Sequence, residues 1–419
     1  MRRCWGLWLV VLVVVGSTAS ATAALADGIT NSGDDLRTGW YPNAQISPEV
    51  VKGGSFGQLW SAAVSGQVYA QPLVAHTPGT PSGETVIAAT ENNEVDGLDA
   101  RTGTREWSDQ FQGTPWNPAH VGCADITPWI GTTATPVIDP ATNTVYVTHK
   151  VSAPLPDDAE WYLDALDATT GVERPNYPLL ISGTADNDPS VTFKPEHEQQ
   201  RPGLLLMNGV VYLGFGGHCD APPWTGWVVG VNVASSTPHI TAMWEDNPTQ
   251  DGAGIWQAGV GLTSDGPNTL LVTTGNGGSP TTPTPGTSPP DTFGESVVRL
   301  HVGADGKLTP VDFFAPFDTA DLDQWDADFG SGALVGLPDQ YFGTSSHPHL
   351  AVAVGKEGYV YLLDRDNLGG LDQGTNGDDK VLQRLGRFGG VWGRPGVWPG
   401  DGGWIYVPTS SNGSTFDVY

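Results

Sequence analysis

Basic side chains are scarce in this chain of 419 residues: 18 Lys and Arg stand against 46 Asp and Glu, for a formal net charge of −28. Nucleic acids and anionic membranes are therefore not expected as partners, because a surface of this sign repels polyanions. The acidic residues are scattered along the chain, which is typical of a solvated folded surface rather than of a disordered acidic tail. The 16 Trp residues also indicate a packed protein, which we expect to be a monomer.

Long apolar runs are also lacking, and the one near the start is too short to span a membrane. Two arginines precede an apolar stretch from Trp5 to Val15, and small residues follow it. This order predicts a signal peptide over residues 1–26, cut after Ala23 or Ala26, and hence a secreted protein. A membrane anchor is the alternative, but a spanning helix needs about 20 apolar residues.

Cysteine is nearly absent, which limits both disulfides and cofactors. Cys4 falls inside the predicted signal peptide, so the mature chain keeps Cys123 and Cys219. Two thiols in an oxidising compartment usually form one disulfide, and two buried free thiols are the alternative. The sequence has no Cys-x-x-Cys-His motif and no Gly-x-Gly-x-x-Gly motif between a strand and a helix, so neither haem nor a nucleotide is expected.

Helical periodicity is nearly absent as well. Short apolar segments alternate with turns rich in the 56 Gly and 34 Pro, which is typical of an all-β protein. A unit of four strands recurs, with Glu94–Asp99 as the third strand of its first copy and Val260–Thr263 as the first strand of its fourth copy. The third strand carries matching residues 68, 65, 69 and 63 positions apart: Leu98, Leu166, Val231, Leu300 and Leu363. One such sheet cannot bury both of its faces, so the repeat predicts a β-propeller over residues 27–419. The alternative, a β-sandwich, does not explain why the four-strand unit occurs five times.

The repeat is longer than the roughly 40 to 50 residues of ordinary propeller blades. Its excess lies in the connections after the second and the fourth strand of each unit, which share one face of a propeller. Long loops that meet on one face predict a binding face. Cys123 and Cys219 both fall in such connections, so we expect a disulfide between neighbouring blades.

Both ends of the repeat array are incomplete in the sequence. A single strand is predicted at Leu59–Val64, before the first full unit, and a sixth unit begins at Gly393 and runs to the last residues. About five and a half blades are therefore expected here, as part of a propeller with seven or eight.

Several motifs resemble those of pyrroloquinoline-quinone (PQQ) proteins. The turn Asp-Ala-x-Thr-Gly with a following Trp is similar to the blade motif of this family, and three further elements resemble quinoprotein alcohol dehydrogenases in the same order. These segments are Asp99–Trp107, Asp167–Gly171, Thr273–Asn276, Gln324–Asp326 and Gly355–Arg365. The resemblance runs from about Val64 to Thr409. It implies a dehydrogenase that oxidises an alcohol or a sugar with PQQ and Ca²⁺.

The resemblance also implies five site residues. Trp256 would form the flat floor under the quinone ring. Asn276 and Asp220 would give oxygen ligands to Ca²⁺. Asp326 would be both a calcium ligand and the general base that takes the proton of the alcohol. Lys356 would hold the carbonyl oxygens of the quinone and stabilise the developing anion.

Each of these residues has a structural alternative. Trp256 is also a residue that packs between blades, Asn276 and Lys356 suit tight turns, Asp220 suits capping of backbone amides, and Asp326 belongs to an acidic, solvated loop. The close pair His347 and His349 has no third ligand at a zinc spacing, so His residues are expected to be structural.

The chain departs from the family at one point. Quinoprotein alcohol dehydrogenases have two adjacent cysteines beside the cofactor, whereas the similar stretch here contains Cys123 alone. A second function is therefore kept open: a non-catalytic propeller that binds a glycan, the cell wall or a protein partner.

Overall fold

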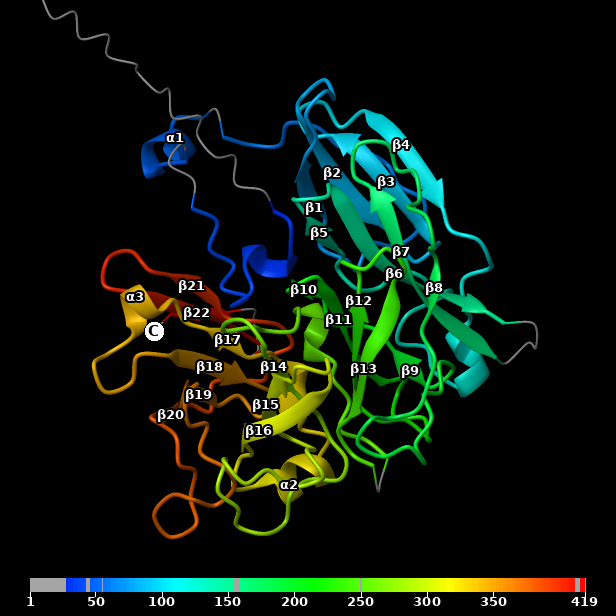
Figure 1. Ribbon diagram of the computed structural model, residues 1–419. Coiled ribbons are helices and arrows are strands. Elements are labelled where there is room, and N and C mark those ends of the chain that lie inside the picture. Colours follow the sequence, from blue (N-terminus) through cyan, green and yellow to red (C-terminus); the bar gives the residue numbers. More distant parts are fainter. Residues whose placement is uncertain are drawn as a thin grey trace, which may run out of the picture.

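The computed structural model describes residues 28–42, 46–54, 56–153, 158–248, 251–410 and 415–418. The predicted signal peptide lies outside these ranges. In the described part of the chain, no helix has the length and the apolar character needed to cross a membrane. The described residues form six antiparallel sheets that follow one another in sequence order (Figure 1).

Each sheet takes its strands from one sequence repeat. The first three are β1–β4 (Leu73–His76, Glu84–Ala89, Glu94–Asp99, Arg105–Gln110), β5–β8 (Val137–Asp139, Thr144–Ser152, Ala159–Asp167, Leu179–Leu180) and β10–β13 (Leu205–Met207, Val210–Gly217, Trp227–Asn232, His239–Glu245), with β9 (Glu198–Gln199) beside β11. The next three are β14–β16 (Thr269–Thr273, Val297–Val302, Leu308–Phe314), β17–β20 (Val335–Gly336, Leu350–Val354, Val360–Asp364, Gln383–Leu385) and β21–β23 (Gly396–Trp398, Trp404–Thr409, Thr415–Val418).

Helices are short and lie in the connections. They are α1 (Pro48–Lys52), α2 (Thr319–Gln324), α3 (Asp339–Phe342) and the 3-10 turns η1 (Asn31–Gly33), η2 (Pro118–Val121), η3 (Gln257–Gly259) and η4 (Phe329–Ser331).

The apolar core lies between the sheets. Leu163 of β7 and Val211 of β11 belong to one buried cluster, which joins the second sheet to the third. Val352 of β18 and Val407 of β22 join the fifth sheet to the sixth in the same way. Each sheet therefore buries its faces against its neighbours, as the repeat predicts for a propeller.

The repeated turn explains why Asp, Gly and Trp recur together. The carboxylate of Asp167 accepts hydrogen bonds from the backbone N–H groups of Thr169 and Thr170 (3.0 and 2.9 Å), which shapes the turn. Gly171 follows with φ at 71°, and a Cβ atom there would lie 2.4 Å from the Trp107 ring of the preceding blade. The indole N–H of Trp107 donates to the carbonyl of Ala168 (3.2 Å). The motif thus docks the first blade onto the second.

The strand predicted at Leu59–Val64 is not a strand in the structure. Instead, the Trp60 indole repeats this docking on the first sheet: it stands against Gly103 and donates to the carbonyl of Ala100 (3.0 Å).

A second predicted strand, Val260–Thr263, is also wrong, apart from a single bridge between Thr263 and Leu271. The physical reason lies in the N-terminal segment. The side chain of Asn31 accepts from the backbone N–H of Gly261 (3.1 Å), and Arg37 donates to the carbonyl of Leu262 (2.9 Å), so in the folded protein these backbone groups do not pair with a neighbouring strand.

The N-terminal segment, residues 28–42, runs between the sheets rather than over the outside (Figure 1). Arg37 is fully buried and also donates to Thr30 Oγ1 (2.6 Å) and to the carbonyl of Asn31 (2.9 Å). Four backbone carbonyls of the segment accept from the first strands of four sheets: Gly28 from Val74, Ile29 from Ile138, Leu36 from Gly336 and Thr38 from Val397. The segment therefore ties distant sheets together.

Candidate functional site

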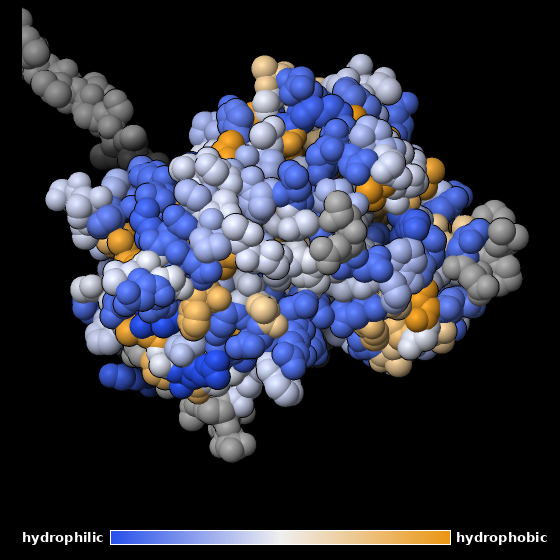
Figure 2. Space-filling view, turned by 90° about the horizontal axis from the view of Figure 1, so that it is seen from below, coloured by the Kyte–Doolittle hydropathy of each residue, from blue (hydrophilic) through white to orange (hydrophobic). Residues whose placement is uncertain are grey.

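A cavity of about 250 Å³ opens among the connections that follow second and fourth strands. Its described lining contains all five residues that the resemblance implies, together with Cys219, one half of the disulfide. Further lining side chains are Asp125, Trp224, Asp328, Ser331 and Trp392. Figure 2 shows that the face on the side of α2 is mostly hydrophilic, with apolar residues in small groups. The cavity therefore lies on the face for which the sequence predicts long connections.

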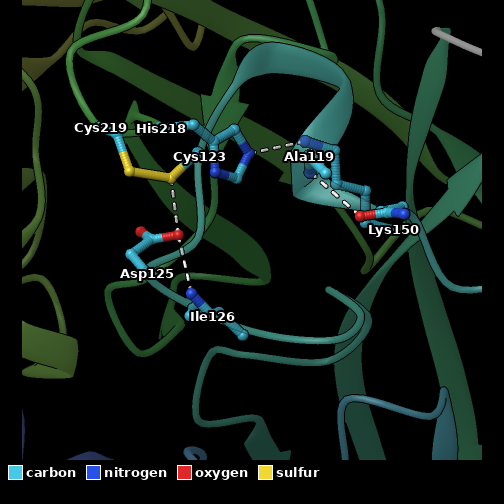
Figure 3. The surroundings of a disulfide bond; sticks show 8 residues. Ala119, Cys123, Asp125, Ile126, Lys150, His218 and Cys219 are labelled. Carbon is cyan, nitrogen blue, oxygen red and sulfur yellow. Dashed lines mark hydrogen bonds between the residues drawn. A yellow bond between two sulfur atoms is a disulfide. The ribbon is translucent and has the colours of Figure 1, made fainter.

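The disulfide predicted between Cys123 and Cys219 is present and forms part of this wall (Figure 3). It joins the connection after β4 to the connection after β11, with the two Cα atoms 5.6 Å apart. Asp125 lies beside it, with Oδ1 2.8 Å from the sulfur of Cys123, and burial raises the pKa of this carboxyl. Cys123, Asp125 and His218 have possible ligand atoms within 4.8 Å of one another. We assign no metal to them, because the Cys123 sulfur is engaged in the disulfide.

Lys356, which also lines the cavity, is held between two carboxylates. Its Nζ lies 2.8 Å from Oδ1 of Asp326 and 2.5 Å from Oδ2 of Asp328. Partial burial by itself would lower the pKa of Lys356, but the hydrogen bonds to Asp326 and Asp328 outweigh it and raise the pKa. Lys356 is therefore a charged group that fixes the position of Asp326.

Asp220 is coupled to the same group of charges. Burial raises the pKa of its carboxyl, and the negative charges of Asp328 and Asp326 raise it further, whereas a hydrogen bond from Asn276 and the charge of Lys356 lower it. A cation bound here would relieve this repulsion, because opposite charge favours the ionised carboxylate.

Asn276 occupies the turn after β14. Its backbone N–H donates to Oδ1 of Asp328 (3.1 Å), and its side chain contacts Asp220. It lies in a bend, where Gly277 and not Asn276 has the positive φ, and its side chain faces the acidic group.

The backbone at the site is strained at three non-glycine positions. Cys219, Asp220 and Asp326 have φ values of 48°, 52° and 50°. Such left-handed conformations are uncommon outside glycine and concentrate at sites where the surrounding structure holds a side chain in a required direction. Here they aim three wall residues at one cavity.

Asp328, which the sequence does not single out within the acidic loop of Asp326, contacts both Asn276 and Lys356. The left-handed turn at Asp326 brings both carboxylates to the same lysine, and no local sequence signal predicts that turn. With Asp125, Asp220, Asp326 and Asp328, the described lining has four carboxylates against the single ammonium of Lys356. The cavity is therefore suited to a cation.

The histidines do not converge. Nδ1 of His347 lies 2.7 Å from Asp364, and that of His349 lies 2.8 Å from Asp366. His218 is buried, with Nε2 2.8 Å from Nζ of Lys150. His197 and His239 contact backbone carbonyls. These contacts agree with the structural role predicted for them.

No protein-family model and no curated protein matches the sequence. Among solved structures, the quinohemoprotein alcohol dehydrogenase of Comamonas testosteroni is similar over 92% of this chain and 57% of its own, with a TM-score of 0.59 and 19% identity. The fold is that of the quinoprotein β-propellers. The quinohemoprotein alcohol dehydrogenase ADHIIG of Pseudomonas putida HK5 has the same TM-score at 18% identity, over 91% of this chain and 57% of its own.

A europium-containing methanol dehydrogenase is similar to this quinoprotein-type propeller with a TM-score of 0.59 and 15% identity, over 92% of this chain and 68% of the other. The chain thus spans 57% of the length of the two alcohol dehydrogenases. Identities this low establish the fold, while the function must be argued from the cavity itself.

Proposed function

We propose that this propeller is a secreted oxidoreductase that binds PQQ and Ca²⁺ in the cavity and oxidises an alcohol or a sugar. One observation carries the proposal: Asp220, Trp256, Asn276, Asp326 and Lys356, spread over 136 residues and three sheets, line one cavity. The fold gathers these connections on one face, and the five residues that the resemblance implies all fall within this single cavity of that face. The disulfide supports export, because disulfides persist in oxidising compartments.

The donor set of the cavity fits a hard cation. Asp220, Asn276 and Asp326 offer carboxylate and amide oxygens, which are the ligands that Ca²⁺ prefers. PQQ itself carries three carboxylates, and the described lining contains no arginine to neutralise them. The quinone is therefore expected to bind only together with the cation, which with Lys356 offsets three of the four aspartate charges.

The lining residues have separate roles in this chemistry. The indole of Trp256 offers a flat apolar surface for a planar ring. Lys356, fixed by Asp328, places its ammonium group beside Asp326 and keeps a positive charge in the cavity. Asp326 is exposed toward the entrance, where its carboxylate accepts the proton of the alcohol. When bound, PQQ supplies the acceptor for the hydride of the alcohol carbon.

A specific observation favours the second function, a non-catalytic binding propeller. Two tryptophans near the cavity are unusually exposed: Trp325 at 73% and Trp392 at 56%. Large aromatic rings left in water are typical of interaction surfaces, because they bury much area when a partner binds. A glycan or a protein partner would use these rings without the cofactor.

The test is to titrate the purified chain with PQQ in the presence and absence of Ca²⁺, and to follow the spectrum of the bound quinone and dye-linked alcohol oxidation. Asp326→Asn should reduce turnover by about 10²-fold or more while quinone binding persists. Asp305→Asn, in an exposed turn between a third and a fourth strand, is the matched control. Failure to bind the quinone at micromolar concentration with Ca²⁺ would exclude the oxidoreductase and leave the binding propeller.

A further inference from the structure

A second cavity, of about 430 Å³, lies beside the candidate site, and Trp224 belongs to the walls of both. Its polar lining includes Glu198 of β9, Glu245 at the end of β13, and Asn247 in the connection after that strand. None of these three residues is part of the proposed quinone site, so a ligand in the second cavity is independent of the proposed function.

These three side chains are almost completely buried and still carry free oxygens. Glu198, Glu245 and Asn247 are each 1% exposed. Among the described residues, Oε2 of Glu198, Oε2 of Glu245 and Oδ1 of Asn247 lack a hydrogen-bond partner. A buried polar group without a partner costs about 1 to 3 kcal/mol, and more when it is charged. Three such oxygens around one cavity indicate that it binds a ligand, which gives these oxygens the partners that the chain does not provide.

Thr225 holds the other oxygens of the two glutamates. Its backbone N–H donates to Oε1 of Glu198 (3.2 Å), and its hydroxyl donates to Oε1 of Glu245 (2.5 Å). The backbone N–H of Asn247 donates to the same Glu245 oxygen (2.9 Å). One oxygen of each carboxylate is thereby fixed, which keeps the second oxygen available to the cavity.

A third carboxylate, Asp246, lies next to this group and is also fully buried. Its Oδ1 accepts from the backbone N–H of Gly226 (3.0 Å) and lies 3.2 Å from the hydroxyl oxygen of Thr225, whose proton is donated to Glu245. Burial is the main cause that raises the pKa of Asp246, and the charges of Glu245 and Glu198 add to it. Without a cation this group therefore favours protonated carboxyls, whereas a bound cation would favour their ionised form.

Neighbouring lysines do not neutralise this charge directly. Nζ of Lys150 donates to the backbone carbonyl of Glu198 (3.1 Å) and contacts Nε2 of His218 (2.8 Å), rather than binding the Glu198 carboxylate. Lys194, at the edge of the cavity, is exposed. The indole N–H of Trp227 is close enough to the Glu198 carboxylate to lower its pKa somewhat. The two groups do not reach the geometry of a hydrogen bond within the described chain.

We propose that this cavity binds a calcium ion through Glu198, Glu245 and Asn247, with water completing the coordination. Two carboxylates and an amide oxygen form a hard, all-oxygen set, and Ca²⁺ accepts such sets in irregular geometries better than Mg²⁺ does. No three carboxylates in the described chain bring their oxygens within 4.8 Å of one another. We therefore do not assign Asp246 as a ligand; its carboxylate would attract the ion from a position outside the ligand set.

The ion would link β9 to the connection after β13. That connection supports the wall between the two cavities, because the backbone N–H of Gly252 donates to the carbonyl of Trp224 (3.0 Å). Calcium in the second cavity is thus a structural ion that stiffens one side of the candidate site.

The probe for the test is Tb³⁺, whose emission is sensitised by nearby tryptophan and is displaced by Ca²⁺. The metal-stripped chain should gain thermal stability with Ca²⁺ and should bind Tb³⁺ in a background that carries both Asp220→Ala and Asp326→Ala, which removes the two carboxylate ligands proposed for the candidate site. Glu245→Gln in that background should weaken Tb³⁺ binding by at least about tenfold and abolish the stabilisation by Ca²⁺. Glu196→Gln, two residues from Glu198 but not in the described cavity lining, is the control and should change neither signal.

A second variant covers the case in which Glu245→Gln does not fold. Asn247→Asp adds a charged ligand at the same place, so it should tighten Ca²⁺ binding and increase the gain in melting temperature. If the variant with both Asp220→Ala and Asp326→Ala shows no sensitised Tb³⁺ emission, or if Glu245→Gln and Asn247→Asp both leave Ca²⁺ binding unchanged, the proposal is overturned.

Discussion

Glu91 offers a sharp test of how burial controls the stability of this propeller. It is 2% exposed, and its Oε2 accepts from the backbone N–H of Gly131 (2.7 Å) and from Thr133 Oγ1 (3.1 Å). Burial raises the pKa of Glu91 to about 7, although these hydrogen bonds and the charge of Arg201 lower it somewhat.

The raised pKa of Glu91 sets how the stability of the fold depends on pH. The ordinary pKa of a glutamate here is 4.5, so the folded state holds its proton more tightly than the unfolded chain does. At about 1.4 kcal/mol per pKa unit, the difference corresponds to about 3 kcal/mol of unfolding free energy. Because the folded pKa is the raised one, this stabilisation is complete below pH 4.5 and is lost as the pH rises through 7.

Glu91→Gln removes this dependence. The amide oxygen can accept the same two hydrogen bonds, and the side chain stays neutral at every pH. Compared with the wild-type chain, the variant should be nearly unchanged near pH 4 and more stable by up to about 3 kcal/mol at pH 8. Urea unfolding between pH 4 and pH 8 measures the difference, with Glu84→Gln at a partly exposed position of β2 as the control. A difference between variant and wild type that does not vary with pH would refute the reasoning.

Three other changes test the fold. Cys219→Ser removes a disulfide across 96 residues and should cost about 2 to 5 kcal/mol in urea unfolding, a loss that a reductant should reproduce in the wild type. Gly171→Ala should destabilise more than Gly377→Ala by at least about 1 kcal/mol, since both have positive φ but only the first meets the Trp107 ring; equal losses would contradict the docking role. Trp325→Ala, at an exposed site, should change the unfolding free energy by less than about 0.5 kcal/mol, so any loss of ligand binding would be a direct effect.

The fold could be predicted because each blade carries its own signal. The strand predicted at Glu94–Asp99 has the observed bounds of β3, since its pattern and its turn are local. The strand predicted at Val260–Thr263, by contrast, could not be recognised as wrong from its local sequence. Its backbone groups form hydrogen bonds with Asn31 and Arg37, which lie more than 220 residues earlier, and no residue near the segment indicates these contacts.

The candidate site was predictable only as far as the family resemblance reached. It pointed to Asp326 and Lys356 but not to the ion pairs between Lys356 and both Asp326 and Asp328, which depend on two loops from different repeats. The second cavity gave no sequence signal at all. Glu198 and Glu245 look like ordinary surface residues, because charged side chains are seldom fully buried, and only the packing of β9 beside β11 encloses them.

The position of the N-terminal segment has a consequence for folding order. Residues 28–42 leave the ribosome before any blade, yet the backbone partner of Thr38 is Val397, in the sixth sheet. The hydrogen bond from Arg37 to the carbonyl of Leu262 likewise requires a segment that is synthesised 225 residues later. Contacts of such sequence separation are slow to form. We therefore expect the blades to pack against one another before residues 28–42 enter the space between the sheets, although these residues are synthesised first.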